Sequence, residues 1–84
     1  MDRHQKLLQY ILTKRGDANV PFDGLCHLLR RMGFEERIRG DHHIFSMAKL
    51  EEIVNIQPIG TKAKPHQVEQ VRDLVLRCSL GIEE

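Results

Sequence analysis

The architecture of this chain can be worked out from one segment, Phe34-Glu35-Glu36-Arg37-Ile38-Arg39-Gly40-Asp41-His42-His43-Ile44-Phe45-Ser46. From Phe34 to Arg39 the residues alternate, with Phe34 and Ile38 on one side and charged residues on the other. This period of two is typical of a strand that buries one face. Gly40-Asp41 is a turn signal, and residues 42–46 form a second short run of strand-forming character. The segment therefore predicts a β-hairpin.

The residues before the hairpin predict a helix that packs against it. Asp23 is suited to cap the N-terminus of this helix, which is expected to reach Met32. Gly33 fits the left-handed position at which such a helix ends. The buried face of the helix is expected to consist of Leu25, Leu28, Leu29 and Met32.

Two further elements are predicted after the hairpin and one at the N-terminus. Residues 52–57 predict a third strand, and residues 58–64 predict a loop. Pro65 suits the first position of a helix that extends to Cys78. The apolar stripe of that helix is Val68, Val71, Val75 and Cys78, flanked by Leu74 and Leu76.

Residues 3–15 predict an N-terminal helix that is capped by Asp2 and ended by Gly16.

This order of elements predicts an α+β fold. A three-stranded antiparallel sheet with helices 23–32 and 65–78 on one face is the economical way to bury the apolar stripes. The helix–strand–strand–strand–helix order is topologically that of a double-stranded-RNA-binding domain, with an extra helix in front. We expect the 84 residues to form a single domain, 1–84, with a core at 20–80 and an N-terminal helical extension at 1–16.

The composition excludes several classes of protein. With 40% hydrophobic and 30% charged residues, the chain is neither collagenous nor disordered. The formal net charge of +1 predicts nothing about polyanion binding, which depends on how the charges are distributed. No apolar run approaches the roughly 18 residues of a membrane span, and the first residues lack the apolar core of a signal peptide. We therefore expect a cytoplasmic protein without a membrane partner.

The cysteines predict neither a disulfide nor a metal centre. Cys26 and Cys78 lie in predicted helices and are expected to be apolar fillers in a reducing compartment. No cysteine or pair of carboxylates completes a metal ligand set at a useful spacing, so no metal and no cofactor are expected.

The dipeptide His42-His43 carries the strongest indication of chemistry. Neighbouring strand residues point to opposite faces, so only one of the two histidines can face a given site. Such a histidine can take a proton from a ribose 2′-hydroxyl while the guanidinium groups of Arg37 and Arg39 hold the phosphate. The alternative interpretation is that one histidine packs against the sheet edge and the other is solvated. We interpret His4 and His27 as solvated surface residues. Arg30-Arg31 is explained by its position at a helix C-terminus, where positive charge is favourable.

A second basic feature is Gly60-Thr61-Lys62-Ala63-Lys64-Pro65. Lys62 and Lys64 stand just before a helix N-terminus, where ammonium groups and free backbone N–H groups together can hold a phosphate. In a double-stranded-RNA-binding domain, phosphate-contacting lysines occupy this same position. The alternative is a solvated basic loop.

Two stretches, Leu28-Leu29-Arg30-Arg31-Met32-Gly33-Phe34 and Arg37-Ile38-Arg39-Gly40-Asp41-His42-His43-Ile44-Phe45, resemble the HicA (YcfA-like) family of bacterial toxins. The resemblance extends over residues 20–80. It implies a double-stranded-RNA-binding-like fold, metal-independent cleavage of mRNA, and a HicB-like antitoxin protein as partner. The family's active histidine, in its Gly-x-His turn, maps onto His42, with Gly40 as the turn residue.

The chain departs from the family pattern at the turn. Asp41 replaces the usual serine; a carboxylate here orients the histidine but also repels RNA phosphates. His43 is a competing candidate, because a shift of one residue in the turn exchanges the two rings. The roles of Arg37, Arg39, Lys62 and Lys64 as phosphate ligands rest on charge and position alone. Two other hypotheses stay open, a catalytically silent RNA-binding module and a protein-interaction domain.

Overall fold

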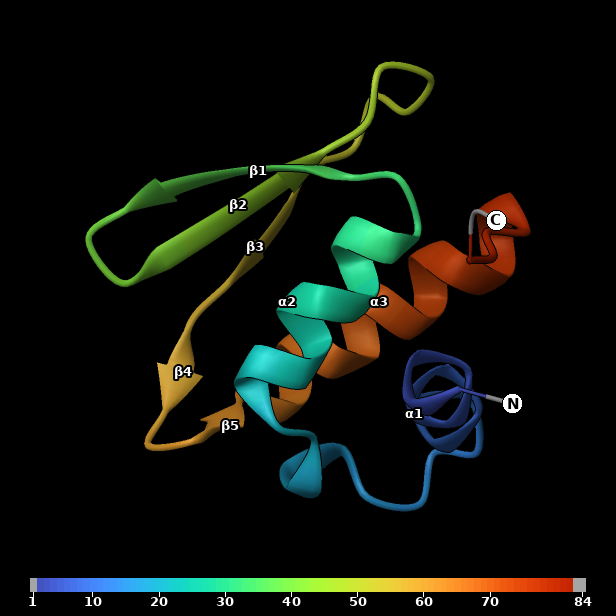
Figure 1. Ribbon diagram of the computed structural model, residues 1–84, viewed down its shortest axis with the longest axis vertical. Helices are drawn as coiled ribbons and strands as arrows, with labels where there is room; N and C mark the ends of the chain where they lie inside the picture. The colour runs from blue at the N-terminus through green and yellow to red at the C-terminus, as the bar shows by residue number, and fades with distance from the viewer. Residues whose placement is uncertain (1, 83–84) are drawn as a thin grey trace.

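The computed structural model describes residues 2–82, which form three α-helices, a three-stranded antiparallel sheet and a second, two-stranded sheet (Figure 1). In chain order the elements are α1 (Arg3–Leu12), the 3₁₀ turn η1 (Asp17–Asn19), α2 (Phe22–Arg31), β1 (Glu35–Arg39), β2 (His42–Ser46), β3 (Val54–Ile56), β4 (Pro58–Ile59), β5 (Lys62–Ala63) and α3 (Pro65–Cys78). The α+β prediction is confirmed. None of the described helices combines the length and apolar character needed to cross a membrane.

The predicted hairpin is confirmed as strands β1 and β2. They pair antiparallel, and the pair Arg39 and His42 closes on the two-residue turn Gly40-Asp41. Gly40 has a φ of +60°, and Asp41 is not among the residues with positive φ, which is the pattern of a type II′ turn. This turn matches the twist of the two strands and so fixes their register.

The third strand is shorter than residues 52–57. Strand β3 pairs with β2 only from Val54, opposite Phe45, to Ile56, opposite His43. Glu52 lies outside the ladder, and its carboxylate accepts two hydrogen bonds of 2.7 Å from Arg77 on α3. The sheet order is β1-β2-β3, so β2 is the central strand.

The prediction of a loop at 58–64 was wrong, because this segment contains the small hairpin of β4 and β5. Gly60, with φ +60°, and Thr61 form a second two-residue turn of the same kind as Gly40-Asp41. The hairpin is anchored to the start of α2 and the residues just before it by two backbone hydrogen bonds of 2.9 Å, from Phe22 N–H to Thr61 and from Ala63 N–H to Val20.

Helices α2 and α3 cover one face of the sheet and leave the other open (Figure 1). From the sheet, the side chains of Phe45, Val54 and Ile56 are buried against them. The predicted stripe of α2 and its C-cap, Leu25, Leu28, Leu29 and Met32, is buried as expected. On α3 the buried residues are Val68, Val71 and Val75 of the predicted stripe together with the flanking Leu74, whereas Cys78 is only partly buried. Leu76, predicted to flank the stripe, is instead 58% exposed.

Two helix ends differ from the predictions. Helix α2 starts at Phe22 after Pro21, and Asp23 lies in its first turn without a capping hydrogen bond. Helix α1 is capped by Asp2 as predicted, but it stops at Leu12, and Lys14 takes a positive φ of 61° before Gly16 is reached. Helix α3 ends at Cys78 as predicted, and the next residue, Ser79, is left-handed. Gly33, with φ 99°, ends α2 as predicted.

Helix α1 belongs to the core. Its residues Leu8 and Ile11 are 9% and 1% exposed and lie in the same apolar cluster as α2 and α3. The guanidinium group of Arg72 on α3 also bonds to the carbonyl oxygen of Ile11 at 3.1 Å. The extension predicted at 1–16 is therefore packed onto the rest of the domain.

Candidate functional site

The two adjacent histidines of β2 point to opposite faces of the sheet. His43 shares the helix-covered face with Phe45, and its ring packs edge-to-face on Phe22 with ring centroids 4.9 Å apart. His42 lies on the open face, where its side chain is 45% exposed, against 20% for His43. Only His42 is therefore presented to a ligand that approaches the open face.

A chain of hydrogen bonds holds the His42 ring. Its Nδ1 lies 3.2 Å from Asn55 Oδ1 on β3, and its Nε2 lies 3.2 Å from the side-chain nitrogen of Gln57. The side-chain oxygen of Gln57 accepts a hydrogen bond of 3.1 Å from the ammonium group of Lys64. These contacts join β2, β3 and the start of α3.

The same contacts assign the protonation of the neutral His42 ring. A lysine ammonium group can only donate, so the amide oxygen of Gln57 must face Lys64 and its NH₂ group must face His42. Nε2 of His42 then accepts, and Nδ1 carries the hydrogen and donates it to Asn55. The lone pair of Nε2 is therefore the basic position of the ring.

Asp41 lies beside this ring without bonding directly to it. Its carboxylate oxygen is 3.8 Å from Nε2 of His42 and accepts a hydrogen bond of 3.4 Å from the Gln57 amide. The Asp41 side chain is 67% exposed, so water screens its charge.

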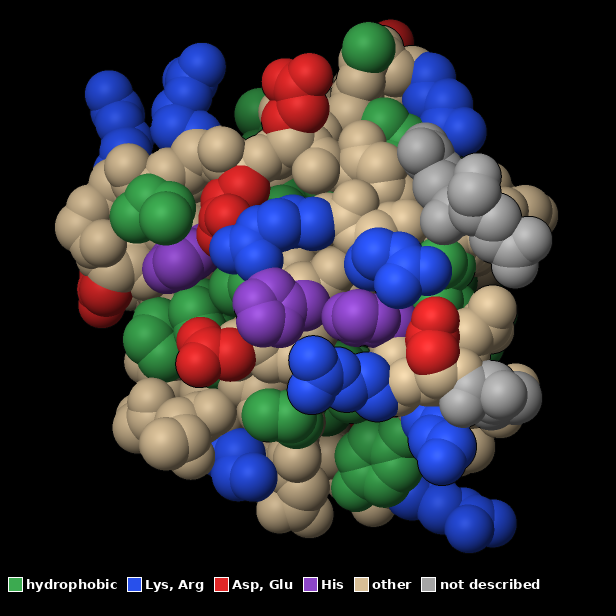
Figure 2. Space-filling view, in the orientation of Figure 1, with side chains coloured by type: hydrophobic (Ala, Val, Ile, Leu, Met, Phe, Trp, Pro, Cys, Tyr) green, Lys and Arg blue, Asp and Glu red, His purple; other side chains and the backbone are tan. Residues whose placement is uncertain are grey.

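Two arginines share the open face with His42. Arg39 pairs across the sheet with His42, and Arg37 pairs with Ile44, so all four side chains project to the same side. Both arginines are exposed, and within residues 2–82 neither forms an ion pair. Lys and Arg side chains extend freely from the sheet side of the molecule in Figure 2.

The structure separates the two predicted lysines. Lys64 reaches His42 through Gln57. Lys62 on β5 is exposed, and its side chain bonds to no other side chain of the described part of the chain. Lys62 lies in β5 and Lys64 is the N-cap residue of α3, and only Lys64 joins the network.

Sequence reasoning missed Asn55 and Gln57. Both lie within the predicted third strand, and the alternation of Val54 and Ile56 with polar neighbours was the available signal. Their contact with His42 requires the cross-strand register of β2 and β3, in which Asn55 stands opposite Ile44. Sequence spacing alone does not supply that register.

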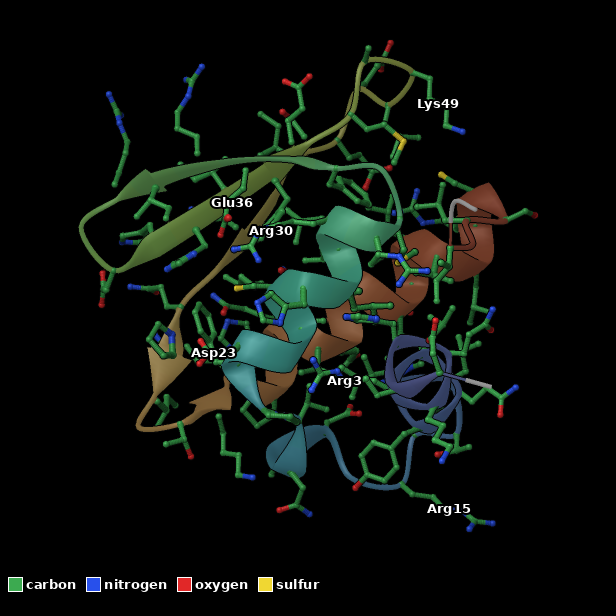
Figure 3. The ribbon with its side chains drawn as sticks, in the orientation of Figure 1. Arg3, Arg15, Asp23, Arg30, Glu36 and Lys49 are labelled. Carbon is green, nitrogen blue, oxygen red and sulfur yellow. The ribbon has the colours of Figure 1, made fainter. Side chains whose placement is uncertain are left out.

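A second polar cluster lies between α2 and the covered face of the sheet. Nδ1 of His43 is 2.6 Å from Oε2 of Glu36 and 3.9 Å from Sγ of Cys26. Nε of Arg30 donates to the other Glu36 oxygen at 2.8 Å, and Figure 3 shows these two side chains meeting between α2 and β1. Burial by itself raises the pKa of Glu36, but the hydrogen bonds from His43 and Arg30 outweigh it and lower the pKa. Burial raises the pKa of the Cys26 thiol to about 12.

A groove with basic walls runs between α1 and α2. The rings of His4 and His27 meet edge-to-face with centroids 6.4 Å apart, and a shallow cavity of about 290 Å³ is lined by both rings with Arg3, Arg30 and Arg31. Figure 2 shows histidine and basic side chains gathered on this face. Arg30 is paired with Glu36 and Arg31 lies 3.6 Å from Asp2, so most of this positive charge is balanced locally.

Comparison of this chain with protein-family profiles, with curated proteins and with solved structures found no match.

Proposed function

We propose that this protein is a HicA-like endoribonuclease with a double-stranded-RNA-binding-like fold, which cleaves mRNA through His42. The observation that carries the proposal is the position of His42. It lies on the open face of the sheet, it shares that face with the exposed Arg37 and Arg39, and its ring is held by Asn55 and Gln57.

In the proposed reaction His42 acts as a general base. Its Nε2 takes the proton of a ribose 2′-hydroxyl, and the 2′-oxygen then attacks the adjacent phosphorus. The bond from phosphorus to the 5′-oxygen breaks, which leaves a 2′,3′-cyclic phosphate and a 5′-hydroxyl that takes its proton from solvent. General-base catalysis of this kind contributes about 10²- to 10⁴-fold in rate.

The neighbours of His42 have defined parts in this reaction. The amide NH₂ of Gln57, which occupies Nε2 in the free protein, moves aside for the 2′-hydroxyl. The bond from Nδ1 to Asn55 Oδ1 stays in place and stabilises the imidazolium that forms. Arg37, Arg39 and Lys64, with Lys62 at the edge, supply positive charge to the phosphates.

A HicB-like antitoxin is the expected partner of this enzyme. The open face of the sheet presents the exposed Arg37 and Arg39 beside His42. A partner that covers this face with acidic groups would block RNA and neutralise the two arginines at the same time. Inhibition by such a partner should therefore be competitive with RNA.

The proposal is tested by comparing His42→Ala with His27→Ala, which removes an exposed histidine from α2 on the helical side. We expect wild type and His27→Ala to arrest bacterial growth on induction and to degrade mRNA. We expect His42→Ala to be folded by circular dichroism and to cleave an RNA oligonucleotide about 10²- to 10⁴-fold more slowly.

Three results would contradict the proposal in different ways. Full cleavage by folded His42→Ala would remove His42 from the reaction. Salt-dependent RNA binding without cleavage by wild type would indicate a silent RNA-binding module. Absence of both binding and cleavage would leave a protein-interaction domain.

A further inference from the structure

Three potential metal ligands converge from three different elements, away from the open face of the sheet. They are Cys26 of α2, Glu36 of β1 and His43 of β2, and one ligand atom from each lies within 4.8 Å of the other two. Thiolate sulfur, carboxylate oxygen and imidazole nitrogen are the three ligand types that Zn²⁺ uses in proteins. The reaction proposed for His42 uses none of these side chains.

We propose that Cys26, Glu36 and His43 form a Zn²⁺ site that fastens α2 to the sheet. Zinc–ligand bonds of about 2.0–2.3 Å at tetrahedral angles place neighbouring ligand atoms roughly 3.3–3.8 Å apart. The separation of 3.9 Å between Cys26 Sγ and His43 Nδ1 is already close to this range. The 2.6 Å contact between His43 Nδ1 and Glu36 Oε2 is a hydrogen bond, and it opens by less than an ångström when the ion replaces the shared proton.

The surroundings hold the three ligands in orientation before any ion binds. Arg30 donates to Oε1 of Glu36, so Oε2 is left to face His43. The ring of His43 is fixed by its edge-to-face contact with Phe22, and Cys26 is only 3% exposed. Outer-shell groups of this kind reduce the rearrangement that metal binding requires.

One of the three ligands borders a cavity. His43 lines a cavity of about 450 Å³ that also touches Phe22 and Asp23 at the start of α2 and Thr61 in the small hairpin, whereas Cys26 and Glu36 do not line it. A three-ligand zinc site takes water as its fourth ligand, and in the proposed site this water would enter beside His43.

Charge and proton balance are consistent with a divalent ion. The Cys26 thiol, whose pKa burial raises to about 12, is protonated in the free protein at neutral pH, and Zn²⁺ displaces that proton. The Nδ1 proton of His43 leaves at the same time, either to Nε2 of the same ring or, from an imidazolium, to solvent. The thiolate and the Glu36 carboxylate then offset the two charges of the ion, and affinity rises with pH because protons are released.

The experiment uses Co²⁺ as a spectroscopic probe for Zn²⁺ on the purified, metal-stripped protein. We expect wild type to bind one equivalent with a thiolate-to-cobalt charge-transfer band in the near ultraviolet, and Zn²⁺ to abolish the band by displacement. Cys26→Ser should lose the band, whereas Cys78→Ser, which changes the other cysteine, should keep it. Glu36→Gln should weaken binding by more than about 10-fold, and Glu35→Gln on the opposite face of β1 should not.

Two results would overturn the proposal. One is the absence of the charge-transfer band from folded wild-type protein in excess Co²⁺. The other is a band that Cys78→Ser removes and Cys26→Ser does not. If Cys26→Ser fails to fold, the melting temperature of wild type and of Glu36→Gln decides the question, since Zn²⁺ at a concentration below the dissociation constant of the variant should raise it in wild type and not in Glu36→Gln. RNA cleavage is measured separately, so failure of this site and failure of the proposed function are distinguishable.

Discussion

At the scale of single residues, the ion pair between Arg72 and Asp17 is expected to contribute measurably to the free energy of unfolding. The Arg72 side chain is 5% exposed and donates to both carboxylate oxygens of Asp17, at 2.8 and 3.0 Å. It thereby joins α3 to the 3₁₀ turn between α1 and α2. Removing one partner of a buried pair leaves the other charge without compensation, which costs more than the pair itself contributes.

We therefore expect Asp17→Asn to lower the free energy of unfolding at neutral pH by about 3 kcal/mol. The hydrogen bonds from Arg72 lower the pKa of Asp17 below its ordinary value of 3.8, in spite of partial burial. The stabilisation from this group is therefore complete above the unfolded-state pKa and is lost as the pH falls through the lower pKa of the folded state. Urea unfolding from about pH 6 down to about pH 3 should show the difference between wild type and Asp17→Asn becoming smaller.

The exposed pair of Arg77 and Glu52 provides the control. Both side chains are more than half exposed, so Glu52→Gln should change stability far less than Asp17→Asn. An equal loss in the two variants would show that burial of Arg72 adds nothing to its pair with Asp17.

The residue scale is also where prediction from sequence was least complete. His42 and His43 were selected from their spacing, and their opposite orientations follow from the period of a strand. Asn55 and Gln57 were not predicted, and neither was the convergence of Cys26, Glu36 and His43. The contacts of His42 with Asn55 and Gln57 depend on the register of β3 against β2. The convergence of Cys26, Glu36 and His43 depends on which side of α2 meets the sheet. Their separations along the chain, 10 residues from Cys26 to Glu36 and 7 from Glu36 to His43, do not indicate that they are close in space.

At the scale of elements, glycine variants in the turns of the β1–β2 and β4–β5 hairpins allow an effect on stability to be separated from an effect on RNA cleavage. Gly40 and Gly60 both have φ +60°, and a Cβ added at either position would meet no atom within 4 Å. The cost of alanine at either glycine is therefore the backbone strain of a positive φ alone, about 1–3 kcal/mol. Gly40 precedes His42 in the hairpin, whereas Gly60 does not neighbour it in sequence.

We expect Gly40→Ala and Gly60→Ala to lose similar stability in urea unfolding, while only Gly40→Ala loses RNA cleavage beyond that accounted for by unfolding. Gly81→Ala is the control, because its surroundings are equally open and its φ is not in the left-handed region. Equal cleavage by the two hairpin variants would mean that the Gly40-Asp41 turn does not position His42.

The elements show which sequence signals were sufficient. Strand β2 at 42–46 and helix α3 at 65–78 have the predicted bounds, because a glycine turn and a proline at the first helical position mark their starts. The hairpin of β4 and β5 was missed although Gly60-Thr61 has the same form as Gly40-Asp41. Its strands are only two residues long, too short for alternation to be visible, and backbone bonds to Val20 and Phe22 hold them in place.

At the scale of the whole molecule, the distribution of charge matters more than its sum. The formal net charge is only +1, so a uniform attraction for RNA is weak. Among residues 2–82, Arg37 and Arg39 on the open face form no ion pair, whereas Arg30, Arg31, Arg72 and Arg77 each have a carboxylate partner. Binding of RNA should therefore depend on a few groups on one face.

Salt dependence measures this directly, because each phosphate contact with a single strand contributes about 0.7 to the slope of log affinity against log salt concentration. Replacing Arg37 and Arg39 together with alanine should lower the magnitude of that slope by about 1.4. Replacing Arg3 and Arg15, which Figure 3 shows on the side of the helices, changes the net charge equally and should leave the slope unchanged. If both double variants reduced the slope by the same amount, RNA would be responding to total charge, and the open face could not be the binding surface.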